Sequence, residues 1–186
     1  MRKNFGVKTY VYPQPVFIIA SYDANGVPNA MNAAWGGISG ENRLSICVDL
    51  HHKTTDNVRA AGAFTVSMAD ADHVAACDYV GVVSGKKVPD KFARAGFTAT
   101  KSEFVNAPVI NELPLCIECR LVSYDEETET IIGEIVNVNA DEKILDENGK
   151  IDVKKLRPII FDTVHNHYHE LGDVVGNAFR DGLALR

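Results

Sequence analysis

Short runs of β-branched and aromatic residues alternate with turn signals along most of the chain, which predicts strands more than long helices. The run over residues 16–22 ends at Asp23-Ala24-Asn25-Gly26, and the Asn-Gly dipeptide favours the tight turn of a β-hairpin. Residues 28–35 are therefore expected to return as the second strand. The same pattern predicts further strands over residues 43–50, 63–68, 115–124, 130–140 and 159–161.

Two short segments are predicted to be helical, one over residues 53–61, which Gly62 follows, and one over residues 71–79. No repeat, linker or block of charge divides the sequence, so residues 1–186 are expected to form one domain. Antiparallel strands with short helices between them predict an α+β fold, mainly an antiparallel and closed β-sheet, not a doubly wound one.

The C-terminal third is less regular. Residues 141–155 are charged and contain the turn Glu147-Asn148-Gly149-Lys150, which predicts a solvated excursion. The tail over residues 172–186 is too apolar for a free chain end, because it carries Val174, Val175, Phe179, Leu183 and Leu185. We expect this tail to dock on its own barrel or on a partner subunit.

Composition and charge narrow the classes of partner. With 46% hydrophobic and 24% charged residues, the 186-residue chain has the make-up of an ordinary folded protein. The formal net charge is −6 and no basic cluster is present, which argues against binding of nucleic acid. The longest apolar stretches, such as residues 16–20, fall far short of the ~20 residues that cross a bilayer. No apolar region follows the basic start, so a cytoplasmic location without membrane attachment is expected.

The four cysteines, Cys47, Cys77, Cys116 and Cys119, lie mostly in apolar segments and are interpreted as reduced thiols. Cys116 and Cys119 have the CxxC spacing of a redox or metal site. In an extended strand, however, residues three apart point to opposite faces, and no second CxxC completes a zinc site. Two structural thiols are favoured, and a redox pair at a bend is the alternative.

Three histidines alternate in the run His165-Asn166-His167-Tyr168-His169, so a strand would present them on one face. This spacing can hold a metal ion, with His51 and His52 as further ligands, although no zinc-enzyme motif such as HExxH accompanies it. The favoured interpretation is a surface or interface histidine face, so no metal site is predicted, and incidental metal binding is the alternative.

A third set of residues is distributed along the chain. Each segment taken alone is explained by a structural role. Small residues before Trp35 suit tight strand packing, Thr54 suits a helix N-cap, and Asp90-Lys91-Phe92 suits a solvated helix start. Their order and spacing carry the signal. The segments are residues 29–37, 52–58, 79–85 and 90–92.

In these segments the sequence resembles the flavin reductase-like, FMN-binding split-barrel proteins, and among them flavoredoxins, from about Pro13 to Gly182. The resemblance implies an FMN-binding split β-barrel with short flanking helices, no catalytic side chain, and a homodimer with FMN near the subunit interface. It also implies which residues contact the cofactor. Asn32, Ala33, Ala34 and Trp35 would lie along the flavin, and His52, Lys53, Thr54 and Thr55 would meet the phosphate, with Ser84 and Lys91 completing the site.

Physical chemistry agrees with this implication. The phosphate of FMN carries about −1.5 to −2 charges, so an acidic protein needs a local cluster of donors to hold it. A helix that begins near Thr54 supplies unpaired N–H groups and the positive end of its dipole. Lys91 beside N1 and O2 of the ring would raise the reduction potential.

Two functions follow from the resemblance. The leading one is an FMN-dependent oxidoreductase that takes hydride from NADH or NADPH, which would bind transiently because no GxGxxG motif is present. The alternative is a flavoredoxin-type electron carrier whose FMN is reduced by a redox protein partner. A metal site at His165, His167 and His169 is a third possibility.

Overall fold

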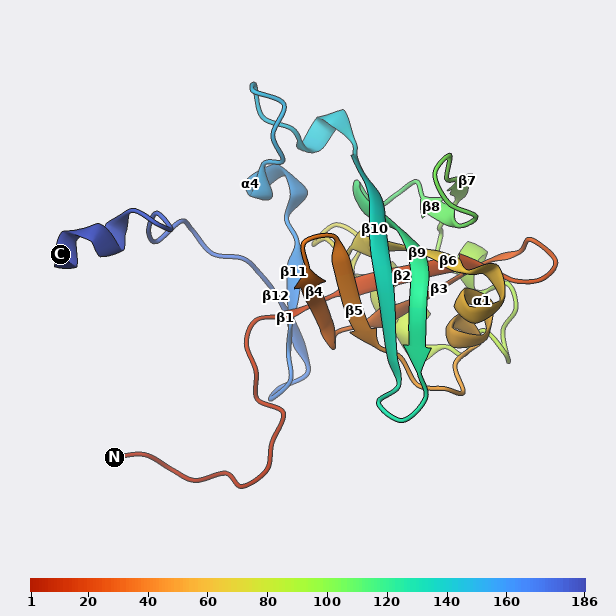
Figure 1. The fold of residues 1–186 in the computed structure, drawn as a ribbon, viewed down its shortest axis with the longest axis horizontal. Coiled ribbons are helices and arrows are strands. Elements are labelled where there is room, and N and C mark those ends of the chain that lie inside the picture. The colour runs from red at the N-terminus through yellow and green to blue at the C-terminus, as the bar shows by residue number, and fades with distance from the viewer.

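The computed structural model describes residues 1–186, and its largest element is a curved antiparallel sheet of seven strands (Figure 1). The strand order is β3-β2-β6-β9-β10-β5-β4, so β3 and β4 are the two edges and the barrel is open between them. The strands are β2 (Phe17–Tyr22), β3 (Pro28–Ala33), β4 (Gly36–Gly40), β5 (Arg43–Cys47), β6 (Ala63–Met68), β9 (Leu115–Asp125) and β10 (Thr130–Ala140). The predicted fold class, mainly antiparallel β with few short helices, is confirmed.

The remaining elements are small and flank this half-barrel. A three-stranded sheet contains β1 (Gln14–Pro15), β11 (Ile159–Asp162) and β12 (His167–Glu170), and a hairpin contains β7 (Ala99–Lys101) and β8 (Pro108–Ile110). The helices are α1 (Lys53–Ala61), α2 (Val74–Val82), α3 (Lys91–Arg94), α4 (Val153–Leu156), η1 (Glu142–Ile144) and η2 (Asp181–Leu185). No helix is long and apolar enough to cross a membrane.

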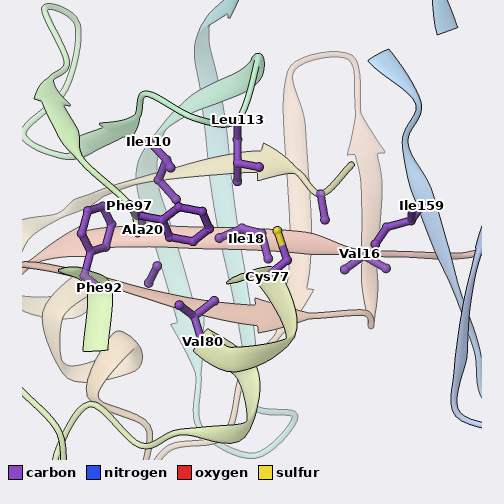
Figure 2. Close-up of a cluster of buried hydrophobic side chains, with 12 residues drawn as sticks. Val16, Ile18, Ala20, Cys77, Val80, Phe92, Phe97, Ile110, Leu113 and Ile159 are labelled. Atoms are coloured by element: carbon purple, nitrogen blue, oxygen red, sulfur yellow. The ribbon is translucent and has the colours of Figure 1, made fainter. Parts of the chain in front are cut away.

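Strand β2 is buried on both of its faces. Its even-numbered residues, such as Ile18, pack in a core with Cys77 and Val80 of α2 and with Phe92 of α3 (Figure 2). Its odd-numbered residues, such as Ile19, face the interior of the half-barrel. This double burial explains why residues 16–20 form an uninterrupted apolar run in place of an alternating one.

The interior of the half-barrel is shaped by the long hairpin of β9 and β10. The pairing of these strands shifts register at Ile132/Gly133 and again at Ile135/Asn137, and such bulges bend a strand and increase its twist. A Cβ atom on Gly133 would lie 2.5 Å from Cζ of Phe64, a side chain with no exposed surface. Glycine at this position therefore leaves room for the central aromatic ring of the barrel.

Helix α2 begins three residues later than the sequence pattern predicts. The carboxylate of Asp70 accepts hydrogen bonds from the backbone N–H groups of Asp72 and His73, at 3.1 and 2.9 Å. This turn holds residues 70–73 outside the helix, because the side chain competes for the backbone donors. The helix extends to Val82, where it packs against β3 and where Lys91 of α3 reaches the carbonyl of Val80.

Both chain ends extend away from the half-barrel on the side where β1, β11 and β12 lie (Figure 1). The C-terminal tail does not dock on its own barrel, since Val174, Val175 and Phe179 are fully or almost fully exposed. The expectation that the tail docks on its own barrel is therefore wrong for the single chain. Docking on a partner subunit stays a prediction.

Candidate functional site

A polar cavity of about 220 Å³ lies at the edge of the sheet, where the start of α1, the end of α2 and the start of α3 meet β3. It brings together five of the residues that the sequence analysis assigns to a cofactor site. Those five are His52, Lys53, Thr54, Ser84 and Lys91, and the cavity is completed by Asn29, Met31, Val80, Gly81, Val82, Val83 and Gly85.

The start of α1 presents unpaired donors to this cavity. His52, not Thr54, is the N-cap residue, and its side chain makes no capping hydrogen bond, which corrects the alternative that Thr54 is the cap. The first N–H groups of a helix have no partner within the helix and carry the positive end of its dipole. The first turn of α1 therefore offers backbone donors beside Lys53 and Thr54.

The hydroxyl group of Thr54 is oriented by a neighbouring strand. Asn29 of β3 donates a hydrogen bond from Nδ2 to Oγ1 of Thr54 at 2.9 Å, and both residues are buried. Because this bond uses a lone pair of the hydroxyl, its hydrogen remains free to donate to a ligand. Asn29 lies in the segment of residues 29–37 singled out from the sequence but was not assigned to the cofactor site, because its contact with Thr54 depends on the tertiary fold.

Thr55 and Lys53 are partly engaged elsewhere. The hydroxyl of Thr55 donates to the carbonyl of Asp49 at 2.7 Å, so the side chain of Thr55 stabilises the approach to α1 and does not line the cavity. The ammonium group of Lys53 lies 3.1 Å from the carboxylate of Asp23 in the β2–β3 turn. A hydrogen bond from the N–H of Val27, with Lys53, holds the pKa of Asp23 below its usual value.

Lys91 is only 3% exposed and connects two elements of the cavity. Its Nζ donates to the carbonyls of Val80 and Val83, each at 2.9 Å, at the C-terminal end of α2. The last carbonyls of a helix lack partners within the helix, so this buried ammonium group satisfies them and offsets the negative end of the dipole. Burial first, and then the charge of Lys53, lower the pKa of Lys91 to about 8.

The loop after α2 approaches the other side of the cavity closely. A Cβ atom on Gly85 would lie 2.4 Å from Oδ1 of Asn29 and 3.3 Å from Cδ of Lys53. Only glycine allows the backbone to lie so near these side chains. The Ser84-Gly85 segment therefore encloses the cavity with main-chain atoms.

A second hollow of about 260 Å³ continues along β3 and shares Gly81 and Val82 with the first. It contains three more of the predicted site residues, Asn32, Ala33 and Ala34, and is completed by Asp78, Phe161 and Tyr168. Because β3 pairs only with β2, one row of its backbone N–H and C=O groups has no strand partner. The hollow thus combines small side chains with free main-chain donors and acceptors.

Tyr168 of β12 joins three elements at this hollow. Its hydroxyl donates to Asp78 of α2 at 2.8 Å and accepts from Nδ2 of Asn32 at 3.4 Å. Burial and the hydrogen bond to Asp78 raise the pKa of Tyr168 to about 12, so its hydroxyl stays protonated. Sequence reasoning did not place Asp78 or Phe161 in the site, because only the fold brings residues so distant in sequence to β3.

Trp35 is not brought together with these residues. It is 55% exposed and lines a separate hollow with Cys47, Thr130 and part of the N-terminal segment. The reason is local: β3 ends at Ala33, and the chain turns at Ala34 and Trp35 into β4. The expected contact of Trp35 with the flavin therefore has no counterpart in the cavities of the single chain.

The CxxC segment is part of the barrel wall. Cys116 and Cys119 lie in β9 and are fully buried. Burial raises the pKa of Cys116 to about 11 and that of Cys119 to about 12, which keeps both thiols protonated and unreactive. The geometry agrees with two structural thiols.

The family model for the flavin reductase like domain matches residues 9–169. The chain belongs to the flavin reductase-like domain family. Flavoredoxin of Desulfovibrio vulgaris (Miyazaki F) is 36% identical, covers 98% of this chain and 100% of its own, and superposes with a TM-score of 0.93. Flavoredoxin from Methanosarcina acetivorans is 29% identical, the match covers 100% of both chains, and the TM-score is 0.88.

The same fold recurs at lower identity. An FMN-binding domain of a flavin reductases-like enzyme from Shewanella baltica is 17% identical and covers 88% of this chain and 89% of its own, with a TM-score of 0.78. The split-barrel fold and the membership of this family are thus both established. Structural neighbours of this chain bind FMN.

The contacts of Lys91 generate a prediction about stability. Lys91→Met removes the only side-chain donor to the carbonyls of Val80 and Val83, and we expect a loss of about 1–3 kcal/mol in the free energy of unfolding. Because the pKa of Lys91 is lowered, the unfolded chain binds more protons between about pH 8 and the ordinary lysine value. The free energy of unfolding of the wild type therefore rises between these pH values, whereas Lys91→Met lacks this contribution. The difference in free energy of unfolding between the two proteins should grow from pH 7 to pH 10.

Urea unfolding of both proteins at the two pH values measures this cost. Lys87→Met is the matched control, because Lys87 is exposed and has no side-chain partner. A cost for Lys91→Met that equals the cost for Lys87→Met would contradict the assignment.

Proposed function

We propose that this chain binds one FMN with its phosphate in the polar cavity at the start of α1 and its ring in the hollow along β3, and that it serves as an electron carrier of the flavoredoxin type. The observation that carries this proposal is the joining of the two hollows at Gly81 and Val82. Together they offer donors for an anion and, directly beside them, an apolar slot with main-chain edges.

The donors of the polar cavity fit a phosphate group. The hydroxyl of Thr54 has a free hydrogen, the first turn of α1 has free N–H groups, and Lys53 and Lys91 supply positive charge. An arriving phosphate would compete with Asp23 for Lys53 and would favour the protonated form of Lys91. A local positive cluster of this kind offsets the formal net charge of −6.

The hollow along β3 fits a flat ring system. Ala33 and Ala34 let a ring approach the backbone, whose unpaired groups can bond the polar edge of the ring. Phe161 and Tyr168 add two aromatic rings to the lining of this hollow. FMN supplies the chemistry of electron transfer, and the protein contributes position and electrostatics. Lys91 lines the polar cavity and not this hollow. The expectation that Lys91 lies beside N1 and O2 therefore requires a different placement of the ring, and it predicts that Lys91→Met makes the midpoint potential of bound FMN more negative.

The likeness to two flavoredoxins over the whole chain supports the electron-carrier role, with a redox protein as the donor. The description of the family as flavin reductase-like supports a second candidate, an oxidoreductase that accepts hydride from NADH or NADPH. Both candidates need the same FMN site. They differ only in what reduces it.

Stopped-flow reduction separates the two candidates. FMN-loaded protein is mixed with NADH or NADPH under anaerobic conditions, and the flavin absorbance is followed. The carrier role predicts that neither nucleotide bleaches the flavin faster than it bleaches free FMN, whereas dithionite reduces it fully. Rapid bleaching by either nucleotide would contradict the carrier role and establish the reductase.

The phosphate site predicts a difference between two flavins. Thr54→Val removes a donor to a charged group, worth roughly 1–3 kcal/mol, so FMN affinity should fall by about tenfold or more. Riboflavin has no phosphate and should be affected much less. Thr55→Val is the comparison from the same turn, because its hydroxyl already donates to Asp49 and its loss should leave FMN affinity near the wild-type value. Equal weakening of both flavins by Thr54→Val would mean that the phosphate lies elsewhere.

We also propose that the protein is a homodimer with its FMN sites at or near the subunit interface. The exposed tail supports this, because Val174, Val175 and Phe179 would otherwise remain in water. An apolar groove of about 450 Å³, lined by Phe17, Ile38, Met68 and neighbours, is open on the same chain and offers such a tail a surface. A symmetric dimer is also the commonest soluble oligomer.

Light scattering tests the dimer directly, and a particle of about twice 20.3 kDa is expected. Deletion of the chain from Gly176 onward should weaken both the dimer and FMN binding, because it removes Phe179, Leu183 and Leu185. Removal of Arg186 alone is the control and should change neither. A wild-type monomer with full flavin occupancy would contradict the interface placement.

A further inference from the structure

The histidine run forms a compact cluster with an aspartate of the neighbouring strand. Asp162 of β11 is the register partner of His167 of β12, and His169 lies on the same face of β12 as His167. One ligand atom of each of these three residues lies within 4.8 Å of the others, and Nε2 of His169 is 3.8 Å from Oδ2 of Asp162. We propose that Asp162, His167 and His169 bind one divalent transition-metal ion of the Zn²⁺ class.

The carboxylate of Asp162 is held in a fixed orientation by several hydrogen bonds. The residue is only 5% exposed, and its oxygens accept hydrogen bonds from the hydroxyl of Tyr12, the N–H of Val164 at 2.8 Å and Nδ1 of His165 at 2.8 Å. Hydrogen bonds of this kind orient a metal ligand and keep it ionised.

The ligand set selects the class of metal ion. Two imidazole nitrogens and one carboxylate oxygen suit Zn²⁺ and its first-row neighbours, whereas Ca²⁺ and Mg²⁺ prefer sets made of oxygen alone. Ligand atoms at about 2.0–2.1 Å from one zinc ion lie about 3.3 Å apart in tetrahedral geometry. The 3.8 Å between His169 and Asp162 therefore closes with a small side-chain rotation.

Both histidines can make that movement because they are exposed. His165 lies in the turn before β12, and its ring stacks on that of His167 with centroids 5.9 Å apart. It is thus near enough to orient the cluster or to add a fourth ligand. A plain histidine face is the favoured interpretation of the sequence because no zinc-enzyme motif such as HExxH accompanies the run. The pairing of Asp162 with His167 across β11 and β12 appears only in the fold.

The cluster is separate from the proposed flavin site but shares its scaffold. Phe161 and Tyr168 alternate with Asp162, His167 and His169 along β11 and β12, so they point to the other face of the same strand pair. Phe161 and Tyr168 line the hollow along β3. An ion on the outer face would clamp the two strands together and hold Tyr168 in place, whether or not the hollow contains FMN.

Calorimetric titration of ZnCl₂ into the full-length protein tests the proposal, with no affinity tag and after treatment with a chelator and dialysis. One zinc ion per chain is expected. Loss of a residue that only hydrogen-bonds a metal ligand weakens metal binding roughly 10–100-fold. His167→Gln and His169→Gln each remove a ligand, so each should weaken zinc binding by at least that factor, and the double variant should abolish it. Both positions are exposed, so these variants should keep the fold, which circular dichroism checks.

Two controls exclude other zinc ligands. His51→Gln changes an exposed histidine outside the cluster, and Cys47→Ser removes the exposed thiol, so both variants should bind zinc as the wild type does. Wild-type protein that fails to bind zinc would overturn the proposal. Unchanged affinity in the His167→Gln/His169→Gln double variant would overturn it too.

Discussion

Strand β2 is buried on both faces and hydrogen-bonded along both edges, and the rest of the fold is arranged around it. Its even-numbered residues hold α2 and α3 on one side, and its odd-numbered residues fill the half-barrel on the other. β6 occupies one edge of β2 and β3 the other, and no further strand pairs with β3, so β3 is the outermost strand. The open edge of β3 lies where α1 begins and α2 ends. The burial of β2 on both faces therefore determines where a ligand can bind free backbone groups.

Charge is concentrated at that place in spite of the acidic composition. The free N–H groups of α1 and the ammonium groups of Lys53 and Lys91 converge on one cavity, although the chain has a formal net charge of −6. Burying Lys91 is costly, as its lowered pKa indicates, and the carbonyls of Val80 and Val83 compensate only in part. An anion in the cavity would complete the compensation. The proposed phosphate would therefore give this buried cation a role in binding.

The sequence predicts some elements to the residue and misses others for physical reasons. The bounds of α1, β6 and β10 agree with the predicted ranges, because an apolar pattern and clear turn residues mark their ends. Strand β4 was missed because Gly36, Gly37 and Gly40 give it little intrinsic β-propensity, and β12 because its exposed histidines show no apolar pattern. Thr54 and Lys91 were identified through motifs, whereas the contacts of Asn29 with Thr54 and of Asp78 with Tyr168 are tertiary, which a single sequence does not show.

We propose that the phosphate of FMN lies at the first turn of α1. Amide chemical shifts in a two-dimensional NMR titration of the labelled protein test it most directly, with FMN and riboflavin compared. We expect FMN to shift the amides of Lys53, Thr54 and Thr55 and riboflavin to leave them nearly unchanged, while both flavins shift those of Ala33 and Ala34. Amides at the start of α1 that do not respond to FMN, or that respond equally to riboflavin, would contradict it.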